Sequence, residues 1–109
     1  MQSLRRVNTM TPGQLLNLGD PNKFIPLRLG LALFIAYDLA TRINNAHIWL
    51  NGSLSLLQST AIATGDITII DKVNKMTENQ TEENIKAACD EYCKKLAEEI
   101  AKDELKHSA

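Results

Sequence analysis

The sequence predicts an all-α protein, a small helical bundle with two long amphipathic helices at about residues 26–50 and 82–106 and short helices between them. Apolar residues recur at spacings of three and four over both long segments, which is the helical period. The chain of 109 residues is long enough for one hydrophobic core. Aromatic residues make up only 5%, so the core must consist mainly of Leu, Ile and Ala.

The first predicted element is a short helix within an N-terminal region, residues 1–19, that also includes an arm. Thr11 is a suitable N-cap, and Gln14 completes a capping box with it. Gly19 is expected to end this helix. Residues 20–26, DPNKFIP, are expected to form a linker or a single turn, and no internal repeat is present. Residues 1–109 are therefore expected to form a single helical domain.

The second element is the long helix over residues 26–50. We expect its apolar stripe to pack against the C-terminal helix. Because the stripe reaches Leu50, Asn51-Gly52 falls where a helix should be capped, and Ser53 or Ser55 would begin the next helix. The stripe residues are spaced alternately by four and three: Ile25, Leu29, Ala32, Ala36, Leu39, Ile43, Ala46 and Leu50.

Asn51-Gly52 also allows an alternative α+β fold with a hairpin at residues 47–57. Asn-Gly between two apolar runs is a strong signal for a two-residue β-turn. The stripe favours the helical interpretation, because a strand would make its last turns accidental. The hairpin would place four side chains on one face: His47, Trp49, Leu54 and Leu56.

Two further helices complete the predicted bundle. Gly65 ends the preceding element and Asp66 caps a helix over residues 67–76, although the β-branched segment DITII could compete as a short strand. Thr81 caps the C-terminal helix, residues 82–106. The stripe of that helix comprises Ile85, Cys89, Tyr92, Leu96 and Ile100.

Charge is segregated along the chain. Residues 1–42 carry five basic and two acidic groups, a net +3, whereas residues 66–109 carry seven Lys and eleven acids, a net −4. Residues 43–65 carry no Asp, Glu, Lys or Arg. This distribution suggests a dipolar subunit that associates head to tail, although charge drift of this size is common in small proteins. The overall net charge of −1 gives no case for nucleic-acid binding.

No catalytic, cofactor or metal motif is found. His47 has no nearby patterned nucleophile, and no Gly-rich phosphate loop or HExxH motif is present. Cys89 and Cys93 lack the partners of a zinc site, so we interpret them as two small buried apolar residues. A small enzyme or redox protein using these two cysteines is the least favoured class. We therefore expect no enzyme, no cofactor and no bound metal.

Several features suggest a contact with another protein. Ala32, Ala36 and Ala40 form a row of small side chains on one side of the predicted long helix. Such a row could allow close approach of a second helix from another chain, or simply tight packing within the domain. Residues 43–65 lack charge, which is typical of a protein core or of a partner interface. Arg5 and Arg6 lie in an acid-free arm that could meet an acidic neighbour. The candidate partner-contact residues are Ala32, Ala36, Ala40, His47, Trp49, Leu54, Arg5 and Arg6.

These observations predict a non-enzymatic structural or assembly subunit that self-associates or belongs to a larger complex, which could be viral. The alternative is a small regulator or inhibitor that binds and blocks a host macromolecule or a signal molecule. Such a regulator could be encoded by a virus. No stretch has the length and apolarity of a membrane span, and no convincing signal peptide is present. We expect a cytoplasmic location or incorporation in a virion or another large assembly.

Overall fold

The computed structural model describes residues 10–40 and 46–108, and for residues 40, 46–52 and 107–108 it describes the backbone only. This part of the chain contains five helices and no strand, so the predicted all-α fold is confirmed. In chain order the helices are α2 (Pro12–Leu16), α3 (Ile25–Ala40), α4 (Ala46–Thr64), α5 (Ile67–Glu78) and α6 (Glu82–Ser108).

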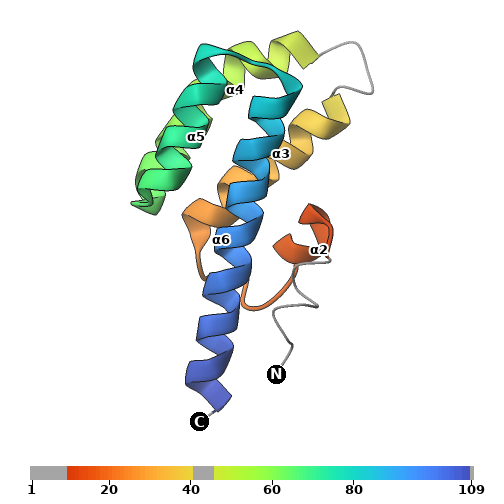
Figure 1. The fold of residues 1–109 in the computed structure, drawn as a ribbon. Coiled ribbons are helices and arrows are strands. Elements are labelled where there is room, and N and C mark those ends of the chain that lie inside the picture. The colour runs from red at the N-terminus through yellow and green to blue at the C-terminus, as the bar shows by residue number, and fades with distance from the viewer. Residues whose placement is uncertain (1–9, 41–45, 109) are drawn as a thin grey trace.

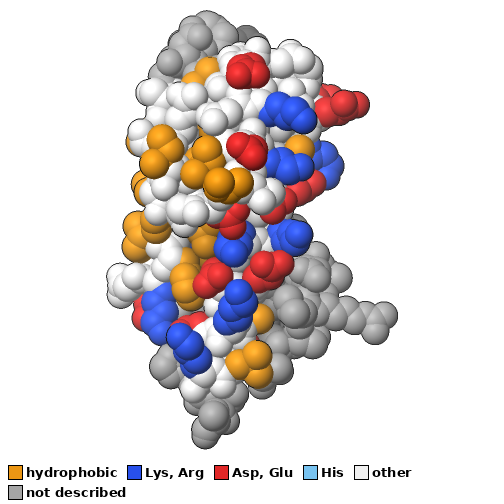
Figure 2. Space-filling view, turned by 60° about the vertical axis from the view of Figure 1, so that its left-hand side comes forward, with side chains coloured by type: hydrophobic (Ala, Val, Ile, Leu, Met, Phe, Trp, Pro, Cys, Tyr) orange, Lys and Arg blue, Asp and Glu red, His pale blue; other side chains and the backbone are white. Residues whose placement is uncertain are grey.

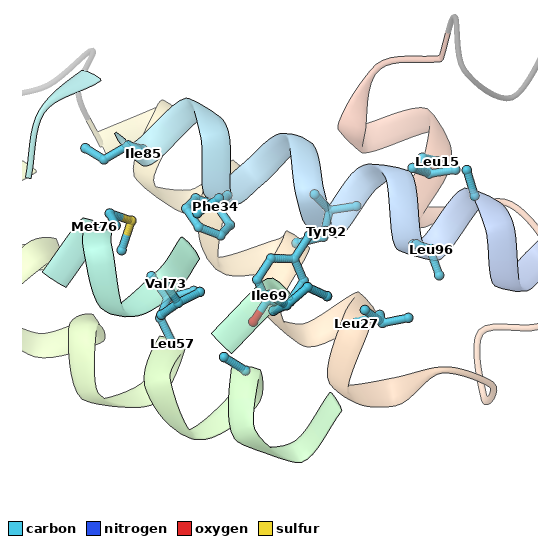
Figure 3. Packing of buried hydrophobic residues seen from close by; sticks show 14 of the residues in the cluster. Leu15, Leu27, Phe34, Leu57, Ile69, Val73, Met76, Ile85, Tyr92 and Leu96 are labelled. Carbon is cyan, nitrogen blue, oxygen red and sulfur yellow. The ribbon is translucent and has the colours of Figure 1, made fainter. Parts of the chain in front are cut away.

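The helices form one bundle in which α6 runs the length of the molecule (Figure 1). Helix α3 packs on α4 and α6, α5 packs on α4 and α6, and α2 contacts α3 and α6. Buried side chains from all five described helices form one core cluster, and Figure 3 shows Tyr92 of α6 in the middle of it. The core contains Leu15, Leu27, Leu31, Phe34, Leu57, Ala61, Ile69, Val73, Met76, Ile85, Ala88, Tyr92, Leu96, Ala97 and Ile100.

The predicted helix starts are confirmed by capping contacts. The Thr11 side chain accepts a hydrogen bond from the Gln14 amide at 3.2 Å, and the Gln14 side chain accepts one from the Thr11 amide at 3.0 Å. Asp66 caps α5, and Thr81 accepts a hydrogen bond from the amide of Asn84 in the first turn of α6. These contacts are local, which is why the sequence pattern predicts them well.

The long helix predicted over residues 26–50 is instead divided between two helices. Helix α3 ends at Ala40 and α4 begins at Ala46, and the two helices pack against each other. The residues between them, 41–45 and with them Ile43, lie outside the described part of the chain. The apolar residues at spacings of three and four over residues 25–50 therefore do not form one continuous helix face, because they belong to two helices.

Asn51-Gly52 neither forms a hairpin nor caps a helix. The backbone is helical through both residues, and α4 continues to Thr64. Glycine inside a helix costs about 1 kcal/mol relative to alanine. Helix α4 packs against both α3 and α5, and tertiary packing of this kind commonly outweighs such a cost.

The face that α3 buries is also opposite to the predicted one. The buried side of α3 carries Leu27, Leu31 and Phe34, whereas Ile25 and Leu29 of the predicted stripe are exposed. The physical reason is that α3 is apolar on nearly every side, so periodicity alone does not identify the face that is buried. On α6, in contrast, the predicted stripe residues Ile85, Tyr92, Leu96 and Ile100 are all buried.

Candidate interaction surface

The outward face of α3 is apolar along the whole helix. Ile25, Leu29 and Leu39 are 51%, 45% and 61% exposed, and Ala32 and Ala36 lie between them, half-buried. At 3.6 residues per turn these five residues share one side of the helix. We refer to Ile25, Leu29, Ala32, Ala36 and Leu39 as the α3 stripe.

The two charged residues of α3 do not interrupt this stripe. Arg28 is buried, and its guanidinium group donates to the carbonyl oxygens of Leu16 and Leu18 in the preceding segment. Asp38 lies on the other side of the helix, where it lines a hollow with Phe34. Single exposed apolar residues are normal on a protein surface, but a whole helix face without a polar side chain is typical of a contact site.

The outer face of α4 is also uncharged. Among residues 53–64, whose side chains are described, the exposed positions carry only small polar or apolar side chains, and we call these positions the α4 face. In the view of Figure 2, apolar side chains gather toward the left, whereas charged side chains lie mainly at the right and in the lower part. Two uncharged outer faces therefore belong to helices that pack against each other. The α4 face comprises Ser55, Leu56, Ser59, Ile62 and Ala63.

The sequence-predicted contact residues on α3 and α4 are only partly brought together by the structure. Ala32 and Ala36 belong to the α3 stripe, and Leu54 is half-buried and packs against the core. His47 and Trp49 lie in the first turns of α4, where only the backbone is described. Ala40 is the last residue of α3 and is likewise described by its backbone alone, and the arm residues Arg5 and Arg6 lie outside the described residues.

The large apolar residues of the surface were missed as contact residues by the sequence interpretation. It assigned Ile25, Leu29 and Leu39 to the core, and it did not single out Ile62, which is 67% exposed. One signal could have identified them. Helix α3 has more apolar residues than one buried face can accommodate, so some of them had to face outward.

The described basic groups of the N-terminal half are engaged in internal contacts. Lys23 forms an ion pair with Asp103 of α6 at 3.0 Å, and Arg28 donates to backbone carbonyls. Head-to-tail pairing of a basic and an acidic end would therefore depend on Arg5, Arg6 and Arg42, which lie outside the described residues. The uncharged faces are the better-supported contact surface.

Two hollows lie near the helix junctions. One, of about 450 Å³, contains Asp66, Lys95 and Glu99. The Lys95 ammonium lies 3.3 Å from Asp66 and 3.8 Å from Glu99, and the hydrogen bond to Asp66 raises the pKa of Lys95. A lysine held in its charged form between two carboxylates is a poor nucleophile or base, so this cluster serves to join α5 to α6.

The second hollow, of about 750 Å³, lies between α3 and α6 and includes Cys89 in its wall. Cys89 and Cys93 are free thiols, both half-buried against the core. A hydrogen bond between them, together with burial, raises the pKa of Cys89. The same hydrogen bond lowers the pKa of Cys93, although burial opposes it. The two cysteines, which the sequence predicts to be buried, are thus only half-buried against the core.

Comparison of the chain with protein-family models, curated proteins and solved structures found no match. Among the described helices, none combines the length and apolarity needed to cross a membrane. The class that the fold defines is an all-α helical bundle, here with two uncharged outer faces.

Proposed function

We propose that this protein is a non-enzymatic assembly subunit that acts through protein–protein contacts and self-associates through the α3 stripe and the α4 face. The observation that carries this proposal is the uninterrupted apolar outer face of α3. In water, this arrangement leaves large aliphatic side chains about half exposed, and a partner chain would cover them.

The free energy gained by burying the α3 stripe is too small to drive stable association alone, so both faces are needed. Burying a Leu or Ile side chain fully is worth roughly 1.5–3 kcal/mol, so covering three half-exposed ones yields about 2–5 kcal/mol. Association costs at least about 4 kcal/mol in lost translational and rotational freedom. The α3 stripe alone would therefore give at most a weak contact, and the α4 face with Leu56 and Ile62 supplies further apolar area.

An interface of this kind makes a specific prediction about salt. Because neither face carries a charged side chain, association through them should persist or strengthen as salt is raised. Head-to-tail charge pairing would instead weaken with salt. A subunit that associates in this way could belong to a larger assembly such as a virion.

The test is sedimentation velocity and light scattering of the full chain across micromolar concentrations at low and high salt. Leu29→Glu introduces a charge into the α3 stripe and should shift the protein toward monomer. Leu105→Glu is the matched control, because Leu105 is 56% exposed and belongs to α6, which contributes to neither face. Trp49→Ala tests the N-terminal part of α4 in the same assay.

The proposal is wrong if the unaltered chain is a monodisperse monomer at every concentration and salt. That result would favour the second candidate, a small regulator or inhibitor that uses the same surface to bind and block a different molecule. If Leu29→Glu and Leu105→Glu both assemble like the unaltered chain, self-association uses some other surface.

A further inference from the structure

The hollow of about 750 Å³ between α3 and α6 has the size of a binding site. Sites that hold small ligands commonly have volumes of about 300–1,000 Å³ and mainly apolar walls with a few polar groups. This hollow has such walls, because apolar and aromatic side chains from three helices line it. They are Pro12 of α2, Phe34, Ile35 and Tyr37 of α3, and Ile85 and Cys89 of α6.

The same hollow is strongly acidic. Four carboxylates and one ammonium group line it, which gives a net charge of −3: Asp38, Glu82, Glu83, Asp90 and Lys86. Lys86 is already paired with Asp90 at 2.9 Å. Glu82 and Glu83 are exposed, and neither forms an ion pair within the described part of the chain. An occupant that suits this hollow must combine positive charge with apolar side chains.

Residues 1–9 of the chain have this combination in their sequence. Arg5 and Arg6 are adjacent, Leu4 and Val7 flank them, and the segment contains no acid. A guanidinium group forks onto a carboxylate and also stacks on an aromatic ring, so both kinds of wall suit it. Nine extended residues span at most about 30 Å. This reach is comparable with the 28 Å width of the molecule, so the segment is long enough to contact a neighbouring copy.

We propose that this hollow binds residues 1–9 of a second copy of the chain, with Arg5 and Arg6 against Glu82 and Glu83. Each copy offers one basic segment and one acidic hollow, so copies join head to tail. The basic groups Lys23 and Arg28 do not compete for this role, because both are held in internal contacts. This contact uses neither the α3 stripe nor the α4 face, so the inference does not rest on the proposed function.

The experiment is a charge exchange, followed by sedimentation velocity of the full chain at low and high salt. Every protein carries Leu29→Glu, which weakens contact through the α3 stripe, and this single variant is the parent. Arg5→Glu/Arg6→Glu reverses the charge of the segment, and Glu82→Lys/Glu83→Lys reverses that of the hollow. We expect the parent to associate at low salt and to dissociate at high salt, because salt screens the contact. Each reversal alone should shift sedimentation to the monomer value at low salt.

A one-to-one mixture of the two reversed variants is the decisive measurement. The acidic segment of one variant meets the basic hollow of the other, and the remaining segment and hollow also match in charge. The mixture should therefore associate although neither variant does so alone. A segment bound to the hollow of its own chain could not be rescued by mixing.

Glu91→Lys/Glu98→Lys is the matched control, because it makes the same charge change on α6 at two residues that do not line the hollow. It should associate like the parent, and circular dichroism should show unchanged helix content in every variant. The inference is overturned if the parent is a monomer at low salt, if reversal of the hollow leaves association unchanged, or if the mixture stays monomeric. Failure of the proposed function is seen separately, since Leu29→Glu would then not reduce association at high salt.

Discussion

Gly30 of α3 lies directly against the ring of Tyr92 of α6, so close that a Cβ atom on Gly30 would be 2.2 Å from Cε1 of the tyrosine. It would also lie 2.5 Å from Cζ and 2.9 Å from the hydroxyl oxygen. Tyr92 is completely buried, and its ring also contacts Phe34 with a centroid separation of 5.7 Å. The absence of a side chain at Gly30 therefore determines how closely α3 can approach α6.

We predict that Gly30→Ala destabilises the protein. The added methyl group must displace a fully buried ring, and overpacking of this kind costs about 1–3 kcal/mol. That cost exceeds the gain of up to about 1 kcal/mol that alanine brings to a helix interior. Urea unfolding followed by circular dichroism would measure the change.

Gly13→Ala in α2 is the matched control for this prediction, because a Cβ there meets no atom within 4 Å. It should be neutral or slightly stabilising. Tyr92→Leu should relieve the effect of Gly30→Ala, so that the double variant loses less than the sum of the two single changes. Equal losses for Gly30→Ala and Gly13→Ala would contradict the close contact.

Tyr92 should also make the stability depend on alkaline pH. Its hydroxyl lies 3.2 Å from that of Thr60, so the two hydroxyls share a buried hydrogen bond, and Thr60 also donates to the Leu57 carbonyl at 2.9 Å. Burial raises the pKa of Tyr92, and the neighbouring Thr60 hydroxyl offsets part of this. Because the folded pKa lies above the unfolded value of about 10, its stabilising effect is complete below that pH and is lost as pH rises through the folded value.

Tyr92→Phe tests this dependence. At neutral pH it should cost about 0.5–1.5 kcal/mol, the net value of one hydrogen bond. Above about pH 10 the difference from the unaltered chain should shrink, because phenylalanine does not ionise. The free energy of unfolding would be measured by urea titration at several alkaline pH values. A difference that stays constant across this range would show that Tyr92 does not carry the alkaline loss.

Asp66 should contribute stability that is lost in acid. Its carboxylate accepts hydrogen bonds from the amides of Thr68 at 2.9 Å and Ile69 at 3.2 Å, and lies 3.3 Å from Lys95. Burial alone would raise the pKa of Asp66, but the hydrogen bond from Ile69 and the contact with Lys95 outweigh it and lower the pKa. The stabilisation is therefore present above the unfolded value of about 3.9 and is lost as pH falls through the folded pKa.

Two substitutions separate the roles of Asp66. Asp66→Ala removes the N-cap and should cost about 0.5–2 kcal/mol at neutral pH. Asp66→Asn keeps a good capping side chain, so it should cost less, but it should reduce the loss of stability below about pH 4. Asp71→Asn, at an exposed position of α5, is the control. If Asp66→Asn loses as much free energy of unfolding below about pH 4 as the unaltered chain does, the prediction is contradicted.

The sequence predicts those parts of the fold that depend on neighbours in the chain. The caps at Thr11 and Asp66 and the buried stripe of α6 are set by residues one or two turns apart, so local pattern suffices. On α3 the pattern fails, because apolar residues occur on both sides of the helix. Contacts between distant parts of the chain, such as that of Gly30 with Tyr92, 62 positions later, decide which side is buried.

The candidate surface was predictable only in part for the same reason. The absence of charge over residues 43–65 indicates a candidate contact surface on α4, and the row of small side chains indicates one on α3. The assignment of Ile25 and Leu29 to the core came from a regular spacing that crosses the end of α3 at Ala40. Which apolar face is left uncovered is a property of the packed bundle.

Arg28 attaches the N-terminal segment that contains α2 to α3. Its buried guanidinium group donates to three backbone carbonyls, those of Leu16 at 2.7 Å, Leu18 at 2.8 Å and Lys23 at 2.7 Å. Burial lowers the pKa of Arg28, and the charge of Asp20 offsets part of this shift. A guanidinium group can reach three acceptors at once because its donors are fixed in a planar fork.

We therefore predict that Arg28→Met costs about 3 kcal/mol or more, because three carbonyl groups lose a charged donor. Arg28→Lys keeps the positive charge but not the planar fork, so it should recover only part of the loss. Because Arg28 joins α3 to the segment that contains α2, the loss should first appear as local opening. Hydrogen exchange of the amides of residues 14–18 would measure it. Exchange there that is no faster in Arg28→Met than in the unaltered chain would show that other contacts, such as the burial of Leu15, hold this segment in place.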